Sequence, residues 1–224
     1  FNSYRGFESL SLRHNIECSM NTPKVIHWFR QDLRLSDNPA LFEAAKNSSI
    51  LPIYILDDIN SKELAMGEAS RFWLHHSLNS LNKSLDQNLS IYSGDPITVI
   101  LDIIDRLDIK EIFWNRCYEP WRINRDTHIK KELESKGIKV NTLNGSLLWE
   151  PWTIKKGDGT PYKVFTPYFR KGCLLSDEPR KPISAPINID LLNDNNSLKD
   201  INSLSLLPST KWDIKMKSFW NIGE

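Results

Sequence analysis

Short apolar segments and longer segments with helical signals alternate between residues 24 and 143. The apolar segments have the length of β-strands and cover residues 24–29, 50–56, 89–93, 111–115 and 138–143. The intervening helical segments cover residues 39–47, 68–86, 96–107 and 121–136. Strands joined through helices need crossover connections, which give a parallel sheet with helices on both faces. The alternation therefore predicts, for residues 20–147, an α/β domain built on a five-stranded, doubly wound parallel sheet.

Capping residues mark the ends of the predicted helices. Asn38 and Asp95 each stand directly before a proline, which is typical of an N-cap followed by proline at the first helical position. Four leucines share one face of the segment 68–86, namely Leu74, Leu78, Leu81 and Leu85. Gly137 follows the last helical segment, where glycine commonly ends a helix. These signals predict where the chain enters and leaves the helices of a Rossmann-like fold.

The segments that flank this domain show no lasting periodicity. Residues 1–19 have no strand or helix pattern and no apolar signal-peptide core, and Met20 resembles a normal protein start. We expect a disordered or non-native tail there rather than a transit peptide, since Glu8 and Glu17 argue against the latter. Residues 148–224 mix Gly, Pro, Ser, Asn and aromatic residues and cannot hold a core of their own. We expect them to wrap the sheet domain or to form an interdomain linker, truncated before a further domain.

Composition excludes several classes of function. Twenty-nine basic and 28 acidic residues give a net charge of +1, so the overall charge indicates neither nucleic-acid nor membrane binding. The apolar runs fall far short of the roughly 20 residues that a membrane span needs, so we expect no membrane contact. Three widely spaced cysteines, Cys18, Cys117 and Cys173, favour a reducing compartment, and we expect a cytoplasmic protein. The cysteines and histidines lack the spacing of zinc ligands, so we expect no metal site.

The common catalytic and nucleotide-binding motifs are missing from the sequence. There is no G-x-G-x-x-G, no G-x-x-x-x-G-K-[ST] and no G-x-S-x-G. The isolated histidines show no partner pattern for nucleophilic catalysis. We therefore predict no catalytic residue on this chain.

Charged and aromatic residues gather after the first and fourth predicted strands. Those after the first strand are Arg30, Gln31, Asp32 and Arg34, and those after the fourth are Arg116, Cys117, Tyr118, Glu119, Trp121 and Arg122. Wound sheets bind ligands beyond the carboxyl ends of their strands, where the winding direction reverses. Mixed charge with aromatic rings suits a planar heteroaromatic ligand, with Glu119 accepting from ring N–H groups. For Asp32 and Arg34 the alternative is structural, in which they pair with each other or with neighbours to pin a loop.

Several long motifs resemble those of the DNA photolyase and cryptochrome family. They are WFRQDLRLSDNPAL, GEASRFWLHHSL, WNRCYEPWRINRD, NGSLLWEP and GDGTPYKVFTPYFR. The resemblance covers residue 24 to about residue 170. The motifs are similar to those of bacterial class III cyclobutane pyrimidine dimer photolyases. The final FWNIGE resembles the point where the family's linker meets its helical domain.

The resemblance implies a division of labour between domains. In this family the amino-terminal α/β domain binds a light-harvesting antenna, either methenyltetrahydrofolate or a deazaflavin. The catalytic FAD and the pocket for damaged DNA belong to a later all-helical domain, which the resemblance implies as this chain's partner. The implied function is that of the antenna-binding part of a monomeric deoxyribodipyrimidine photolyase. A cryptochrome-type blue-light photoreceptor and a freestanding nucleotide-binding module of the same fold are the alternatives.

The resemblance also implies particular cofactor-binding residues. Glu119 matches a carboxylate that contacts the antenna in deazaflavin binders. Gln31 falls where those binders often have arginine and Cys117 where they have an acid, which weakens the case for a deazaflavin. Arg71 is a further, weaker candidate.

Tryptophan rings favour the folate alternative. A related branch of the family holds folate against tryptophan, and Trp121 with Trp114 or Trp149 would do the same here. We therefore expect methenyltetrahydrofolate as the antenna, with a deazaflavin as the alternative and FAD only in the later domain.

Overall fold

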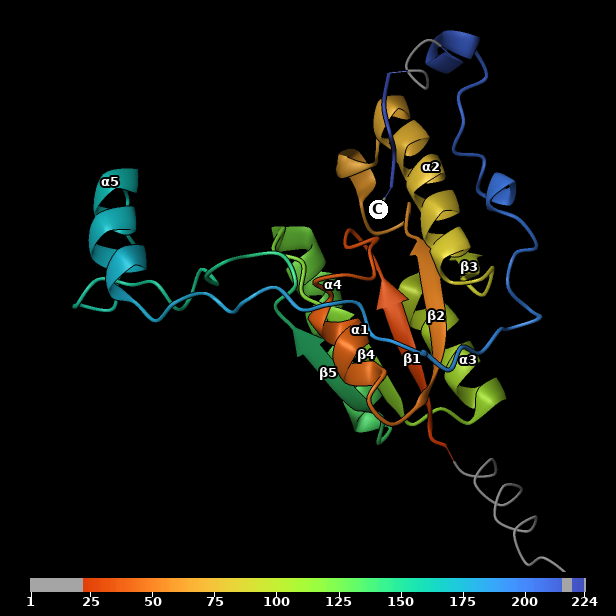
Figure 1. Cartoon of the computed structure of the whole chain (residues 1–224), viewed down its shortest axis with the longest axis horizontal. Coiled ribbons are helices and arrows are strands. Elements are labelled where there is room, and N and C mark those ends of the chain that lie inside the picture. Colours follow the sequence, from red (N-terminus) through yellow and green to blue (C-terminus); the bar gives the residue numbers. More distant parts are fainter. Residues whose placement is uncertain (1–21, 215–218, 224) are drawn as a thin grey trace, which may run out of the picture.

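The computed structural model describes residues 22–214 and 219–223 and contains one parallel five-stranded sheet (Figure 1). Its strands are β1 (Lys24–Phe29), β2 (Ser49–Leu56), β3 (Ser90–Ser93), β4 (Glu111–Asn115) and β5 (Lys139–Leu143). They lie in the order β3-β2-β1-β4-β5. The long connections are α1 (Pro39–Ala44), α2 (Glu68–Ser84), α3 (Pro96–Leu107) and α4 (Pro120–Ser135). The predicted doubly wound α/β fold is confirmed, whereas the predicted tail at residues 1–19 lies outside the described residues.

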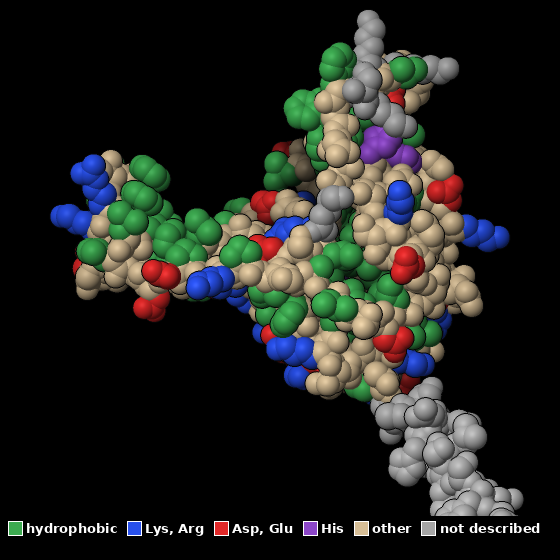
Figure 2. Space-filling model, viewed as in Figure 1, with side chains coloured by type: hydrophobic (Ala, Val, Ile, Leu, Met, Phe, Trp, Pro, Cys, Tyr) green, Lys and Arg blue, Asp and Glu red, His purple; other side chains and the backbone are tan. Residues whose placement is uncertain are grey.

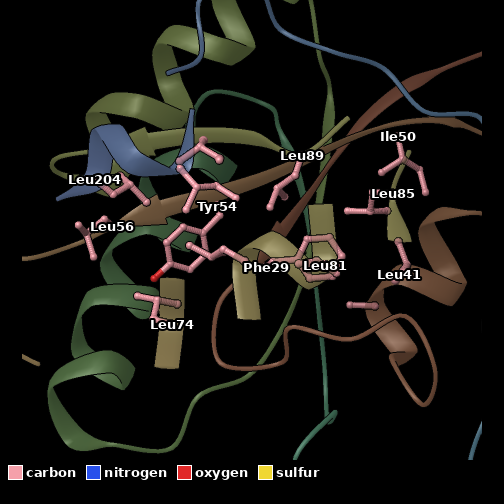
Figure 3. Packing of buried hydrophobic residues seen from close by; sticks show 14 of the residues in the cluster. Phe29, Leu41, Ile50, Tyr54, Leu56, Leu74, Leu81, Leu85, Leu89 and Leu204 are labelled. Atoms are coloured by element: carbon pink, nitrogen blue, oxygen red, sulfur yellow. The ribbon is translucent and has the colours of Figure 1, made fainter. Parts of the chain in front are cut away.

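Two hydrophobic layers hold the helices on the sheet. Val25 and Phe29 of β1 face α1 and α2, and this layer includes the four leucines predicted to line one side of α2. Figure 3 labels Phe29 and three of these leucines, Leu74, Leu81 and Leu85. Ile26 and Trp28 point the other way and pack with α3 and α4. A parallel sheet covered on both faces needs apolar side chains in both directions. This requirement explains why its strands appear in the sequence as continuous apolar runs.

The starts of α1 and α3 are at the predicted cap residues. Asn38 caps α1, because its side-chain oxygen accepts from the Leu41 backbone N–H at 3.1 Å. Asp95 is the N-cap residue of α3, with Pro96 at the first helical position, as predicted. Its carboxylate accepts from the Thr98 hydroxyl and the Asn60 amide in place of a backbone N–H of α3.

Helix α1 ends at Ala44, before the predicted limit at residue 47. The Ser48 hydroxyl bonds the Ala44 carbonyl, and Ser49 already bonds as the first residue of β2. The chain therefore leaves the helix early in order to enter the strand.

Gly137 ends α4 in a left-handed conformation, with φ at +78°. The Ile138 N–H bonds the Leu133 carbonyl at 3.0 Å, as in a Schellman turn. We expect Gly137→Ala to lower the free energy of unfolding by about 1–2 kcal/mol, because a Cβ disfavours this backbone conformation. Urea denaturation measures the loss. Gly157→Ala is the matched control, since Gly157 is exposed and has no positive φ, and equal stability losses in both variants would contradict the explanation.

Part of the segment after the sheet wraps around it. The Ile50 N–H bonds the Asp190 carbonyl at 2.8 Å, and the Leu192 N–H bonds the Ile50 carbonyl at 2.7 Å. Further along, the Leu198 N–H bonds Ile91 on the outer edge of β3 at 2.8 Å. Residues 201–206 then add three buried side chains to the core beside α2, namely Ile201, Leu204 and Leu206.

Asp194 anchors this wrapping segment. Its buried carboxylate accepts from the Tyr92 hydroxyl at 2.5 Å and from Arg106 at 2.7 Å. Burial raises the pKa of Asp194, but the bonds from Arg106 and Tyr92 lower it further, to about 2. The carboxylate is therefore ionised, and its bonds to Tyr92 and Arg106 fix this segment against the sheet domain.

Candidate functional site

A cavity of about 760 Å³ lies at the carboxyl ends of β1 and β2. Its walls come from these strands, the loop after β1, the first half of α2, the start of α4 and the segment that contains Asn221 and Gly223. Its apolar and aromatic lining consists of Trp28, Leu33, Tyr54, Ile55, Met66, Trp73, Leu74 and Trp121. Strand β1 pairs with β2 on one side and β4 on the other, so the winding reverses beside it. The cavity therefore occupies the switch point at which wound sheets bind ligands.

Charged residues in the lining are mostly positive. Four arginines and one aspartate contribute, namely Arg30, Arg34, Arg122, Arg125 and Asp57. Each of the four arginines also forms an ion pair with a carboxylate, so most of this positive charge is balanced within the protein. The lining therefore combines aromatic rings with guanidinium groups that can donate hydrogen bonds.

Arginine and tryptophan side chains alternate along one wall. The Arg30 guanidinium lies 5.0 Å from the ring centre of Trp28, and Arg125 lies 5.1 Å from the same ring. Arg125 is also 5.1 Å from the ring of Trp121, which Arg122 approaches at 4.9 Å. Each contact is within the range of a cation–π interaction. The stack holds Trp121 in place at the start of α4.

Two buried carboxylates neutralise the inner part of this stack. Asp126 pairs with Arg30 and, at 2.8 Å, with Arg125. Asp57, at the end of β2, accepts from Arg125 at 2.9 Å. Burial lowers the pKa of the Arg125 guanidinium, but the two aspartates raise it more, so the net shift is upward. Arg125 is therefore a stable cation that ties α4 to β2.

Two predicted site residues meet across the switch point. Gln31 lines the cavity, and its side-chain amide donates to the Glu119 carboxylate at 2.7 Å. Burial raises the pKa of Glu119, but backbone N–H groups, Gln31 and the Arg122 charge outweigh it and hold the pKa below its usual value. Glu119 is therefore an ionised acceptor beside the cavity, and Trp121 lines the cavity itself.

Cys117 and Arg71 do not line the cavity. Cys117 is buried, and the Arg122 guanidinium donates to its sulfur at 3.7 Å. Burial raises the pKa of this thiol. Arg71 instead pairs with Asp58 at 2.5 Å and donates to the Met66 carbonyl. Each side chain is thus engaged outside the lining.

The two tryptophans considered as partners of Trp121 also lie elsewhere. Trp114 is buried in the core edge-on to Trp28, with ring centres 5.6 Å apart. The Trp149 indole donates to the Asp177 carbonyl at 3.0 Å, in the segment that follows the sheet domain. The tryptophans that line the cavity beside Trp121 are instead Trp28 of β1 and Trp73 of α2.

Asp32 holds the loop after β1 from inside. One carboxylate oxygen accepts from the Arg30 backbone N–H at 3.0 Å and the other from the Asn115 side chain at 2.5 Å. Asn115 also donates to Asn38, the cap of α1, at 2.7 Å. Arg34 donates to backbone carbonyls, including that of Gly145 at 2.5 Å. The two side chains bond other residues and not each other, while the Arg34 backbone N–H donates to the Asp32 carbonyl at 2.7 Å.

Several lining residues were absent from the sequence-based candidates, and Arg125, Asp57 and Trp73 are among them. Arg125 stands one helical turn after Trp121, so the two share a face of α4, and this spacing is a usable signal. Asp57 directly follows β2, whose end adjoins that of β1. No local sequence pattern predicts that Trp73 lines the cavity, because only the packing of α2 on the sheet brings it there.

Within the described ranges, no group of three His, Cys, Asp or Glu residues is arranged to hold a metal ion. The helices of the same part of the chain are all too short or too polar to cross a bilayer.

A doubly wound parallel sheet with a lined cavity at its switch point defines a ligand-binding α/β domain. The family model described as DNA photolyase matches residues 25–186, and the chain belongs to this family, as its motifs predicted. It is 34% identical over 211 residues to a deoxyribodipyrimidine photo-lyase of Agrobacterium fabrum, a match over 92% of this chain and 43% of the relative.

Other relatives and a solved structure agree with this assignment. The chain is 39% identical over 156 residues to cryptochrome-2 of Arabidopsis thaliana, covering 67% of this chain and 25% of the relative. The crystal structure of a class III photolyase from Agrobacterium tumefaciens superimposes with a TM-score of 0.82 at 34% identity, over 92% of this chain and 43% of that one. The chain thus spans less than half the length of these relatives.

Proposed function

We propose that the chain is the antenna-chromophore-binding domain of a deoxyribodipyrimidine photolyase. The observation that carries the proposal is the cavity at the switch point, with its aromatic walls and its arginines. The whole protein would repair pyrimidine dimers in DNA by light-driven electron transfer from a reduced FAD held in a further, helical domain. This domain would gather light for that reaction and would not catalyse it alone.

Methenyltetrahydrofolate is the proposed antenna, and a deazaflavin is the alternative. The cavity volume of about 760 Å³ lies within the usual range of small-molecule sites. Trp121 and Trp73 offer ring surfaces, and the ionised Glu119 lies beside the cavity, where it bonds the lining residue Gln31. When bound, such a chromophore absorbs light and passes its excitation energy to the flavin.

Titration with methenyltetrahydrofolate tests this proposal through Glu119. The protein should bind the chromophore, and Glu119→Gln should weaken binding about tenfold, because a charged acceptor is replaced by a neutral amide. Absorbance titration measures both dissociation constants. Glu43→Gln is the control, since Glu43 is exposed on α1 and pairs with Lys46. Equal binding by the Glu119 variant and the wild type would remove Glu119 from the site.

An exposed apolar segment supports a domain partner. Residues 147–175 extend from the sheet domain, with α5 (Phe165–Pro167) at their far end (Figure 1). Hydrophobic side chains gather on this extension (Figure 2), and Leu148, Phe165 and Leu175 are 71%, 72% and 78% exposed. Exposed apolar patches of this kind mark interaction surfaces. We propose that the helical FAD domain covers them, that damaged DNA binds through that domain, and that the protein is a cytoplasmic monomer.

A cryptochrome-type photoreceptor is the second candidate. The 39% identity to a plant cryptochrome favours it, since this domain is common to both kinds of protein. An assay for repair of pyrimidine dimers in DNA under blue light, with the full-length protein, distinguishes the two functions. Repair supports the photolyase, and its absence supports the photoreceptor. The third candidate is a freestanding nucleotide-binding module of the same fold. It would have no helical domain encoded in the same reading frame.

A further inference from the structure

The extension that contains α5 holds a shape of its own. Ile154, on its outgoing half, and Cys173, on its returning half, are 3% and 2% exposed. Gly172 passes so close to Ile154 that a Cβ on this glycine would lie 2.5 Å from an Ile154 methyl group. Close-packed groups of this kind deform little. The two halves of the extension therefore form one packed element.

The outgoing half is attached to the end of β4. The Glu150 carboxylate accepts from the Arg116 guanidinium at 2.6 Å and from the Tyr118 hydroxyl at 2.8 Å. The Trp152 ring packs against the same two side chains, with its centre 5.8 Å from that of Tyr118 and 6.0 Å from the Arg116 guanidinium. The Glu150 side chain is 14% exposed, and partly buried ion pairs are screened much less than exposed ones. We call these contacts the outgoing anchor.

The Tyr118 hydroxyl remains a donor in this anchor. Burial and the bond to Glu150 raise the pKa of Tyr118 to about 12. The phenol therefore keeps its proton at neutral pH, and its bond to the carboxylate is charge-assisted.

The returning half is attached to the loop before α1. Arg180 donates to the Asp37 carboxylate at 2.5 Å, and the Ile183 N–H donates to the same carboxylate at 3.2 Å. The Asp37 N–H donates in turn to the Ile183 carbonyl at 2.7 Å. The bond from Arg180 lowers the pKa of Asp37, which favours its ionised form. We call these contacts the returning anchor.

A further bond joins the two halves between the anchors. The Trp149 indole donates to the Asp177 carbonyl at 3.0 Å and closes the base of the extension. One anchor would leave a pivot, whereas two anchors on different parts of the sheet domain fix a direction.

We infer that Glu150 and Arg180 are positioning residues, which hold the extension at a fixed angle to the sheet domain and so present its exposed apolar face in a preformed orientation (Figure 1). The inference goes beyond the proposed function, which supplies only the identity of the partner, the helical FAD domain. A surface that is ordered before docking loses less conformational entropy than one that is ordered by it.

Backbone dynamics of this chain test the inference without a chromophore or a partner. Nitrogen NMR relaxation gives an order parameter for each amide, roughly 0.85 in rigid backbone and below about 0.6 in flexible segments. In the wild type, residues 152–175 should have the same order parameters as β4. Glu150→Ala should lower those of the extension below about 0.6 and leave those of β4 unchanged, because only the outgoing anchor is lost.

Three further variants complete the experiment. Glu150→Gln should retain most of the order, because its amide oxygen can accept from the same donors. Arg180→Ala should loosen the extension to a smaller degree, since Ile183 still bonds Asp37. Glu178→Ala is the matched control, because Glu178 is exposed in the segment that follows the extension, and it should change no order parameter.

Thermal unfolding checks that each variant folds, and Arg180→Ala decides if Glu150→Ala does not fold. Low order parameters throughout the extension of the wild type, or wild-type values in the folded anchor variants, overturn the inference. An equal loss of order in β4 and the extension would show that Glu150 supports the whole fold, which also overturns it. Because no ligand is used, failure of the proposed function would leave these measurements unaffected.

Discussion

Acidification from pH 7 to pH 4 should destabilise the protein by about 3 kcal/mol through His27 alone, and His27→Leu should abolish this part of the loss. His27 is in the middle of β1 and is completely buried, and no described residue bonds either ring nitrogen. Burial lowers the pKa of His27 to about 4; the nearby Asp32 charge opposes the shift and Arg30 adds to it.

The direction of the effect follows from proton binding. The unfolded chain protonates this histidine below about pH 6.5, whereas the folded protein does so only near pH 4. Between these values the unfolded state binds more protons, so stability falls as the pH falls. The window of the effect is therefore pH 6.5 to 4, and the imidazole is neutral in the folded protein at pH 7.

Urea unfolding at several pH values measures the effect. In His27→Leu the free energy of unfolding should vary less between pH 6.5 and 4 than in the wild type. His128→Leu is the control, because His128 is exposed on α4 and its replacement should leave the pH dependence unchanged. Parallel curves for the wild type and His27→Leu would show that the buried histidine does not control acid stability.

Asp32→Ala should lower the free energy of unfolding by about 3 kcal/mol, because it leaves buried donors without an acceptor. Those donors are the Arg30 backbone N–H and the side chain of Asn115, which together connect β1 and β4. The damage should extend to α1, whose cap Asn38 belongs to the same network. Chemical denaturation measures the loss of stability.

A surface aspartate provides the control for Asp32. Asp102 pairs with Arg106, and its side chain is 62% exposed. Asp102→Ala should change stability by less than about 1 kcal/mol, since exposed ion pairs contribute little. If the two alanine variants lost equal stability, the Asp32 network would not be the element that holds the switch point together.

Much of the secondary structure was predictable because it depends on neighbours in the sequence. Strands covered on both faces need apolar side chains throughout, so β1 can be recognised in the sequence as a continuous run of apolar residues. Asn38 caps the helix that follows it within three residues, and Gly137 adopts a conformation that its own lack of a Cβ allows. The prediction differs where more distant groups compete, as at the end of α1, where the Ser49 N–H already bonds the Pro23 carbonyl beside β1.

The site was predictable only in part. The sequence by itself determined that charged and aromatic residues follow the ends of β1 and β4, because parallel strands place these ends at one edge. Only the tertiary structure decided which of them face the cavity: Trp121 lines it, while Cys117 is buried outside the lining. It also added Trp73 from α2, since the packing of a helix on a sheet, and not its sequence, sets which of its side chains meet residues far along the chain.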